Sequence, residues 1–129
     1  GVHVPEELIV KGKAVMNVLL PRESLEKFVD LALLSLIWPY EVVEPEYVDQ
    51  ILKNVEYHLL RNHGVIRYKG DRYYNRNEDG TSEEAEWTFG LSWLAIIYAK
   101  RGEREKAEQF LEMAKKTITK KGLIPELYY

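Results

Sequence analysis

Four expected helices of alternating character constrain the fold of this chain more than any other feature. Residues 24–37 and 81–102 carry apolar side chains on nearly every face of the helix. Residues 45–62 and 103–121 carry a single apolar stripe. A helix that is apolar all round must be buried all round, whereas a striped helix lies between core and water. The order therefore predicts two helical pairs in which inner and outer helices alternate.

This alternation predicts an all-α fold built of two helical hairpins from an (α/α)6 toroid. The alternative is a four-helix bundle with two unusually apolar helices. The first twenty residues differ, because Glu7–Val10 and Ala14–Val18 form two short apolar runs around a Gly12 turn, which is typical of a short β-hairpin. We therefore expect an extended lead-in over residues 1–20 and an α/α-toroid fragment over residues 21–129.

Local signals place the ends of these helices. Pro45 occupies a favoured first-turn position, and the second helix is expected to end near residues 62–64. Thr81, with Glu84 three residues later, is a candidate capping box for the third helix. Gly102 is the candidate stop that separates the third helix from the fourth.

Composition excludes several classes of function. The chain has 18 Lys+Arg against 21 Asp+Glu, so a dominant nucleic-acid interface is not expected. No apolar run is long enough to span a membrane. The absence of cysteine excludes disulfides and Cys-ligated zinc, fits a cytoplasmic location, and with 30% charged residues points to a thermophile. The first residue is Gly1 rather than Met, so we expect an upstream part to be missing.

The segment at residues 65–80 concentrates the side chains that suit carbohydrate chemistry. Aromatic rings (Tyr68 and Tyr74) stand beside Arg67 and Asp71. An arginine fork of donors with a carboxylate acceptor can hold neighbouring sugar hydroxyls. The alternative is a solvated loop with an internal Arg67–Asp71 pair. The final segment, residues 123–129, also follows a striped helix, so both segments are expected at one end of the helices.

Outside that segment the candidates are fewer. Pro125 fixes the backbone just before Glu126, although a glutamate near a terminus is usually a surface residue. Trp87 is the better tryptophan for a rim position, at the loop end of its helix. His58 and His63 are not spaced as a ligand pair, and no glycine-rich phosphate loop is present, so we expect no metal and no cofactor. The lysines that close the fourth helix are interpreted as a solvated end: Lys115, Lys116, Lys120 and Lys121.

The order and spacing of several short stretches resemble glycoside hydrolase family 15, the glucoamylase-like enzymes. The resemblance covers residues 22–129 and corresponds to the C-terminal part of that family's catalytic domain. Two departures are Leu127, where the family usually has Gln, and a longer, more acidic connection between residues 75 and 87. The matching stretches are Asp30–Leu36, Arg67–Tyr68 with Asp71, Tyr73–Asn75, Trp87, Trp93–Ala95 and Gly122–Glu126.

This resemblance implies an inverting glycoside hydrolase that releases glucose from α-glucan ends, with Glu126 as the catalytic general base. The family's general acid has no counterpart in this chain. We therefore expect a fragment that is inactive alone and needs the missing N-terminal part of the domain or self-association. The implied partner is an α-glucan or oligosaccharide substrate, bound by Arg67, Tyr68, Asp71, Tyr74 and Trp87.

Two interpretations compete with the hydrolase. A tetratricopeptide pattern would make the chain a helical-repeat interaction module without catalysis, and it is matched by Leu94, Tyr98, Gly102, Ala107, Leu111 and Ala114. No second copy stands one repeat earlier, and such arrays need about three repeats to bury a core. The other interpretation is a carbohydrate-binding or regulatory fragment that has lost catalysis.

Overall fold

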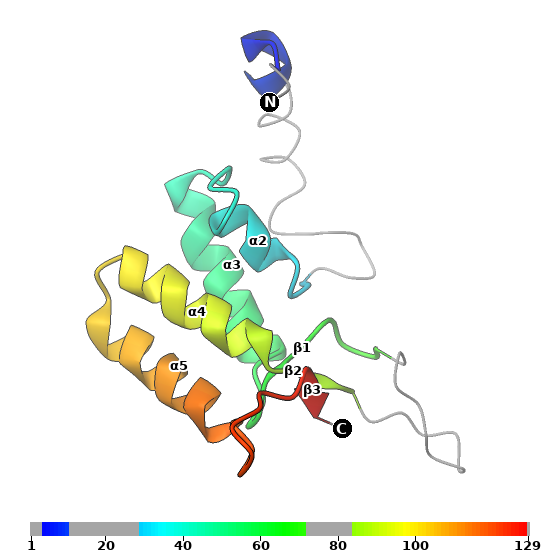
Figure 1. Ribbon diagram of the computed structural model, residues 1–129. Helices are drawn as coiled ribbons and strands as arrows, with labels where there is room; N and C mark the ends of the chain where they lie inside the picture. The colour runs from blue at the N-terminus through cyan, green and yellow to red at the C-terminus, as the bar shows by residue number, and fades with distance from the viewer. Residues whose placement is uncertain (1–3, 11–28, 72–83, 129) are drawn as a thin grey trace.

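The computed structural model describes residues 4–10, 29–71 and 84–128 of the chain. The all-α class is confirmed: helices dominate, accompanied by one small sheet (Figure 1). None of the described helices is long and apolar enough to cross a membrane. The helices are α2 (Leu33–Ile37), α3 (Pro45–His58), α4 (Phe89–Lys100) and α5 (Arg104–Lys116), and the strands are β1 (Val65–Ile66), β2 (Glu86–Trp87) and β3 (Leu127–Tyr128).

Helix α4 lies at the centre of the helical layer, as its all-round apolar character predicts. Figure 1 shows α4 between α5 on one side and α2 with α3 on the other. Its side chains at Leu91, Leu94 and Ile97 are at most 1% exposed. The striped helix α3 buries the stripe that its sequence predicts, including Val48, Ile51, Leu52 and Val55. The stripe of α3 is therefore confirmed, whereas α4 is buried on most but not all of its faces, since Phe89, Ser92 and Ala99 are exposed.

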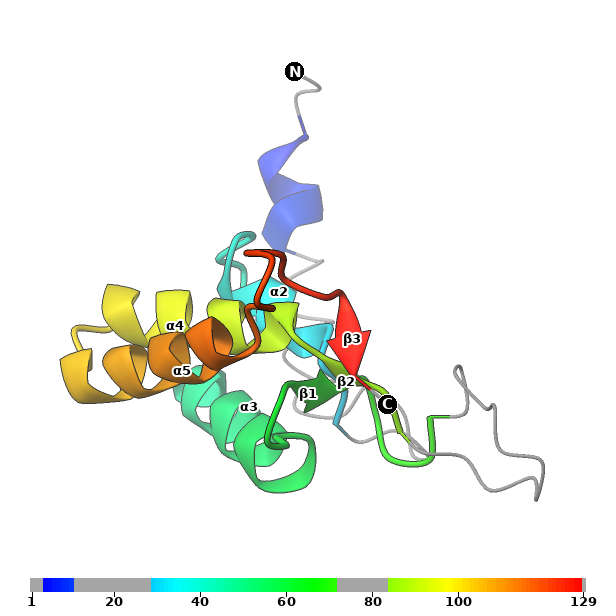
Figure 2. The ribbon, with the colours of Figure 1, turned by 60° about the horizontal axis from the view of Figure 1, so that its bottom comes forward.

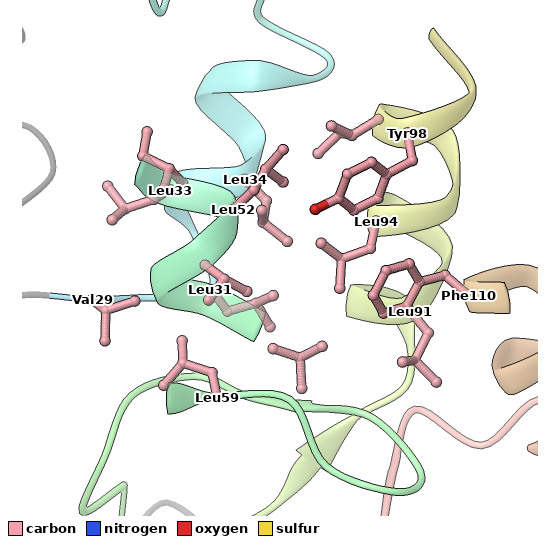
Figure 3. Packing of buried hydrophobic residues seen from close by; sticks show 14 of the residues in the cluster. Val29, Leu31, Leu33, Leu34, Leu52, Leu59, Leu91, Leu94, Tyr98 and Phe110 are labelled. Atoms are coloured by element: carbon pink, nitrogen blue, oxygen red, sulfur yellow. The ribbon is translucent and has the colours of Figure 1, made fainter. Parts of the chain in front are cut away.

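The buried side chains form one cluster that joins all of these elements (Figure 3). Leu31 and Leu34 face the α4 side chains, and Leu59 closes the cluster near the sheet. Helix α5 contributes Phe110, which is 1% exposed and whose ring stacks on Tyr98 at 5.7 Å between centroids. Burial of each such side chain contributes about 1.5–3 kcal/mol, so the cluster is the main source of stability.

The small sheet is the main departure from the expected helix ends. The helix expected from residue 81 begins at Phe89, because Glu86 and Trp87 pair as a strand with β1 and β3. Glu84, from the expected capping box, precedes β2, and its carboxylate accepts a hydrogen bond from the Gly70 N–H; Thr81 lies outside the described residues. Helices α3 and α5 also end earlier than expected, at His58 and Lys116.

The helix expected over residues 24–37 also begins later than expected, because a hydrogen bond to the chain that continues β1 holds its first described residues. Leu31 donates its N–H to the carbonyl of Arg67 at 2.8 Å, which holds residues 29–31 along the continuation of β1. The Asp30 carboxylate then accepts from the Ala32 N–H at 2.7 Å, and α2 begins at Leu33. Residues 24–28 of that expected helix lie outside the described residues.

The β-hairpin expected over residues 1–20 falls mostly outside the described residues. In the described part, residues 6–10 form a helical turn, with the Ile9 N–H bonded to the Pro5 carbonyl at 3.3 Å. This differs from the extended run expected at Glu7–Val10. The strands that the structure does contain come from the middle and the end of the chain.

A buried tyrosine predicts how stability changes at alkaline pH. Burial, and a hydrogen bond to the Glu56 carboxylate, raise the pKa of Tyr98 to about 12. A raised pKa favours the neutral phenol in the folded state, so this stabilisation is complete below the unfolded pKa of about 10 and is lost as pH rises towards about 12. We expect Tyr98→Phe to cost about 1 kcal/mol at neutral pH and to flatten the loss of stability between those values.

Urea unfolding at a series of pH values checks this expectation. Tyr57→Phe is the matched control, since Tyr57 lies on α3 with 84% of its surface exposed. The Lys106 amine lies 2.9 Å from a Glu56 oxygen and 3.2 Å from the Tyr98 hydroxyl, so Tyr98→Phe also lowers the raised pKa of Lys106, whereas Tyr57→Phe leaves it unchanged. Parallel stability curves for Tyr98→Phe and the parent chain would show that the phenol is not the titrating group.

Candidate functional site

The three-stranded sheet brings together candidate residues that are far apart in the sequence. Strand β2 lies in the middle, with β1 and β3 antiparallel on either side. Arg67 follows β1, Trp87 belongs to β2, and Glu126 precedes β3. Figures 1 and 2 show this sheet at the end of the molecule where α4 begins. The predicted Tyr74 lies outside the described residues.

A tight turn after α3 starts the sheet. The Arg61 N–H donates to the Gly64 carbonyl at 2.9 Å, and Leu60 forms a bridge with Val65. Gly64 is required because a Cβ there would lie 2.7 Å from the backbone of both Glu86 and Trp87. The close approach of β2 therefore depends on glycine at this position.

Arg67 and Asp71 form the most tightly built part of the candidate site. The guanidinium donates to both carboxylate oxygens, from Nε at 2.6 Å and from an Nη nitrogen at 2.8 Å. Asp71 is 1% exposed, whereas the Arg67 side chain is 33% exposed. The hydrogen bond to Asp71 raises the pKa of Arg67. This bidentate pair fixes the turn at residues 68–71 on the sheet.

The aromatic candidates pack around that guanidinium. It lies 5.4 Å from the Trp87 ring and 5.7 Å from the Tyr68 ring, which are cation–π distances. Trp87 is 9% exposed and meets Phe89 edge to face at 6.0 Å. The indole therefore belongs to the core beneath Arg67 and does not stand open at a rim. The internal Arg67–Asp71 pair left open as an alternative is present in the structure.

Glu126 is held by its backbone and exposed at its side chain. Its carbonyl accepts from the Thr88 N–H at 3.2 Å, and the Thr88 hydroxyl donates to the Pro125 carbonyl at 2.7 Å. The register pairs Leu127 with Trp87, so Glu126 lies level with Thr88. Arg67 follows Ile66, which pairs with Glu86, and so lies at the other end of β2, roughly 10 Å away along the strand direction. The sheet therefore places the two residues on opposite sides of β2, three positions apart along it.

Three contacts that sequence reasoning missed complete this end of the molecule. The Glu86 carboxylate accepts from the His63 N–H at 2.6 Å. The His63 ring stacks on Tyr128 with 4.8 Å between centroids, and the Tyr128 hydroxyl donates to the Thr117 carbonyl at 3.1 Å. These contacts join β3 to the turn after α3 and to the end of α5. No local sequence signal announces them, because each joins segments that only the sheet brings together.

The chain is similar to regulatory subunits of a kinase. It is 34% identical, over an alignment of 146 positions that covers 98% of the chain, to the probable phosphorylase b kinase regulatory subunit alpha of Caenorhabditis elegans. It is 27% identical over the same extent to the skeletal muscle isoform of that subunit from Oryctolagus cuniculus. The chain spans about 12% of the length of each relative. No family model matches the chain.

These relatives correct the function that the sequence led us to expect. They bear the name of regulatory subunits, so the prediction of a glucoamylase-like hydrolase that releases glucose is wrong. The predicted α-glucan or oligosaccharide partner falls with it, as do the descriptions of the chain as an inverting glycoside hydrolase and a carbohydrate-metabolism enzyme. The helical architecture behind the resemblance is unaffected by this correction.

The Thr88 hydroxyl predicts how firmly the C-terminal strand is attached. We expect Thr88→Val, which keeps the side-chain shape and removes the donor, to cost about 1 kcal/mol and to speed amide exchange in residues 123–128. Hydrogen–deuterium exchange measures the local effect, and Thr88→Ser is the control because it keeps the hydroxyl. Equal exchange in the Val and Ser variants would show that the hydroxyl does not hold the strand.

The Arg67–Asp71 pair predicts a measurable coupling energy. In a double-mutant cycle with Arg67→Gln and Asp71→Asn we expect about 1–2 kcal/mol, between the values for exposed and buried pairs, because only the carboxylate is fully buried. Arg104 and Glu108 provide the control, since they have the same i,i+4 spacing but are 88% and 60% exposed. Their coupling should be smaller than that of Arg67 and Asp71, and equal couplings in the two cycles would contradict the role of burial.

Proposed function

We propose that this chain is a non-catalytic part of a kinase regulatory subunit of the phosphorylase b kinase alpha type. One observation carries the proposal: similarity to such a subunit extends over 98% of the chain at 34% identity. A similarity of this extent includes the sheet and both helical pairs. The proposal corresponds to the regulatory alternative that the sequence left open.

The geometry of the candidate site supports a structural role for its residues. Both carboxylate oxygens of Asp71 are engaged by Arg67, and the guanidinium covers a buried indole. These groups brace the sheet against the helices. Glu126 contributes its backbone carbonyl to the same brace while its side chain is exposed. On this view the residues that resemble a hydrolase site serve here to hold the fold together.

The proposal includes the architecture that the sequence predicted. We propose that residues 21–129 belong to an α/α toroid similar to that of glycoside hydrolase family 15, with α2 and α4 as inner helices. The central position of α4 and the single buried stripe of α3 support this arrangement. The shared architecture would account for the matching stretches without shared chemistry. A cytoplasmic location, expected from the lack of cysteine, is part of the same proposal.

Two assays on the protein test the proposal. Mixed with the catalytic subunit of a phosphorylase b kinase, the protein is expected to co-elute in size-exclusion chromatography and to change the rate of phosphorylase phosphorylation. Incubated with maltooligosaccharides, the protein and its Glu126→Gln variant are expected to release equally negligible glucose. Glucose release that Glu126→Gln abolishes would overturn the proposal, as would an unchanged kinase rate together with no co-elution.

A further inference from the structure

An exposed apolar face of α5 continues into the turn that follows the helix. The sequence predicts one stripe on α5, yet only Phe110 of that stripe is buried. Leu111 on α5 is 46% exposed, and Ile118, two residues beyond the end of the helix at Lys116, is 45% exposed. The core covers half of the stripe and leaves the other half open.

That face borders a groove between α4 and α5. The groove has a volume of about 530 Å³, and small residues on both helices keep it open. Leu111 belongs to both the face and the groove, so the two form one continuous apolar surface. Its lining residues are Ala95, Ile96, Ala99, Gly102, Arg104, Ala107, Glu108 and Leu111.

The turn after α5 adds two more exposed apolar side chains. The Thr119 N–H donates to the Leu123 carbonyl at 2.8 Å, which brings Leu123 back beside Thr119. Leu123 is 64% exposed and Ile124 63% exposed. The groove and the face thus end in an exposed apolar corner.

Positive charge surrounds this corner. Residues 111–124 contain four lysines and a single acidic residue, Glu112, in a chain whose net charge is -3. Glu112 is paired with Lys115 at 2.6 Å, which leaves the other lysines in excess. At the opposite end of the groove, Arg104 and Glu108 neutralise each other at 2.8 Å. The surface is therefore neutral near the start of α5 and positively charged near and beyond its end.

We propose that this surface, the groove together with Leu111, Ile118, Leu123 and Ile124, docks an acidic amphipathic helix of a partner protein. Helix α5 is about 20 Å long, which matches a partner helix of about 13 residues. Its apolar residues would follow the i, i+4, i+7 spacing that fills a groove between helices, and its acidic residues would lie over the lysine-rich end.

A protein helix fits this surface better than a lipid membrane. The groove is concave and accepts a ridge of side chains, whereas a flat bilayer surface would leave it empty. This docking proposal goes beyond the proposed regulatory role. It rests on exposed side chains, the groove and the charge around it, whereas the proposed function rests on similarity to relatives.

Fluorescence anisotropy with a designed probe tests the proposal. The probe is a labelled helix-forming peptide of Leu and Glu with the spacing given above. Its controls are a scrambled peptide of the same composition and a version with Lys in place of Glu. We expect saturable binding of the first peptide alone. Leu111→Asp should weaken it at least about tenfold, since burying a leucine side chain contributes about 1.5–3 kcal/mol.

Gln109→Asp is the matched control for that variant. It adds the same charge to the same helix at an exposed position on the opposite side from Leu111. Reversing Lys120 and Lys121 to Glu should weaken binding and reduce its salt dependence, whereas Lys53→Glu on α3 should change neither. Thermal unfolding of each variant shows whether the fold is retained.

Several outcomes would overturn the proposal. One is equal binding of the designed and scrambled peptides, and another is the absence of binding at millimolar peptide. Equal losses for Leu111→Asp and Gln109→Asp in folded variants would place the peptide elsewhere. Stronger retention on phosphatidylserine-containing vesicles than on the peptide would identify the surface as a membrane contact instead.

Discussion

The pairing of Glu86 and Trp87 with strands on both sides is the interaction on which the rest of the structure depends. Each strand contributes only two residues, and an isolated pair of such strands would not persist in water. The sheet is stable because the core lies beneath it: Trp87 is buried, and a Cβ at Gly90 would lie 2.7 Å from the Val65 side chain. The sheet and the packing of α4 therefore require each other, and together they fix the direction in which α4 leaves the sheet.

Sequence periodicity predicted the parts of this fold that local burial decides. The stripe of α3, the central position of α4 and the stop at Gly102 follow from side-chain pattern and turn chemistry alone. The helix ends did not follow, because strand pairing overrode them. Glu84 had a plausible local role in a capping box, yet its carboxylate bonds to Gly70, a residue that only the folded chain brings near. Helix and strand propensities depend on residues that are neighbours in the sequence. These contacts join residues that are distant in the sequence and close together in the fold.

The candidate site shows the same division between residues and their roles. Sequence reasoning selected Arg67, Asp71, Trp87 and Glu126, and all four lie on or beside the sheet. It also assigned them a chemistry that the similarity to kinase regulatory subunits contradicts. A paired arginine and aspartate, a tryptophan beneath them and a proline before a strand all help to fix loops on a scaffold. A motif of this kind therefore indicates a shared architecture more directly than it indicates a shared reaction.

The exposed half of the α5 stripe follows from the same geometry. A helix of 13 residues with one apolar stripe can cover α4 on only one side, and Phe110 occupies the position that faces Tyr98. Leu111, one residue later, is turned about 100° away and cannot reach the same core. An apolar side chain at that position adds little to the stability of the described fold, and its surroundings become positive towards the end of the helix. A solvated helix end would account for the lysines, but it does not account for the two exposed leucines and two exposed isoleucines among them, which a docked amphipathic helix would cover.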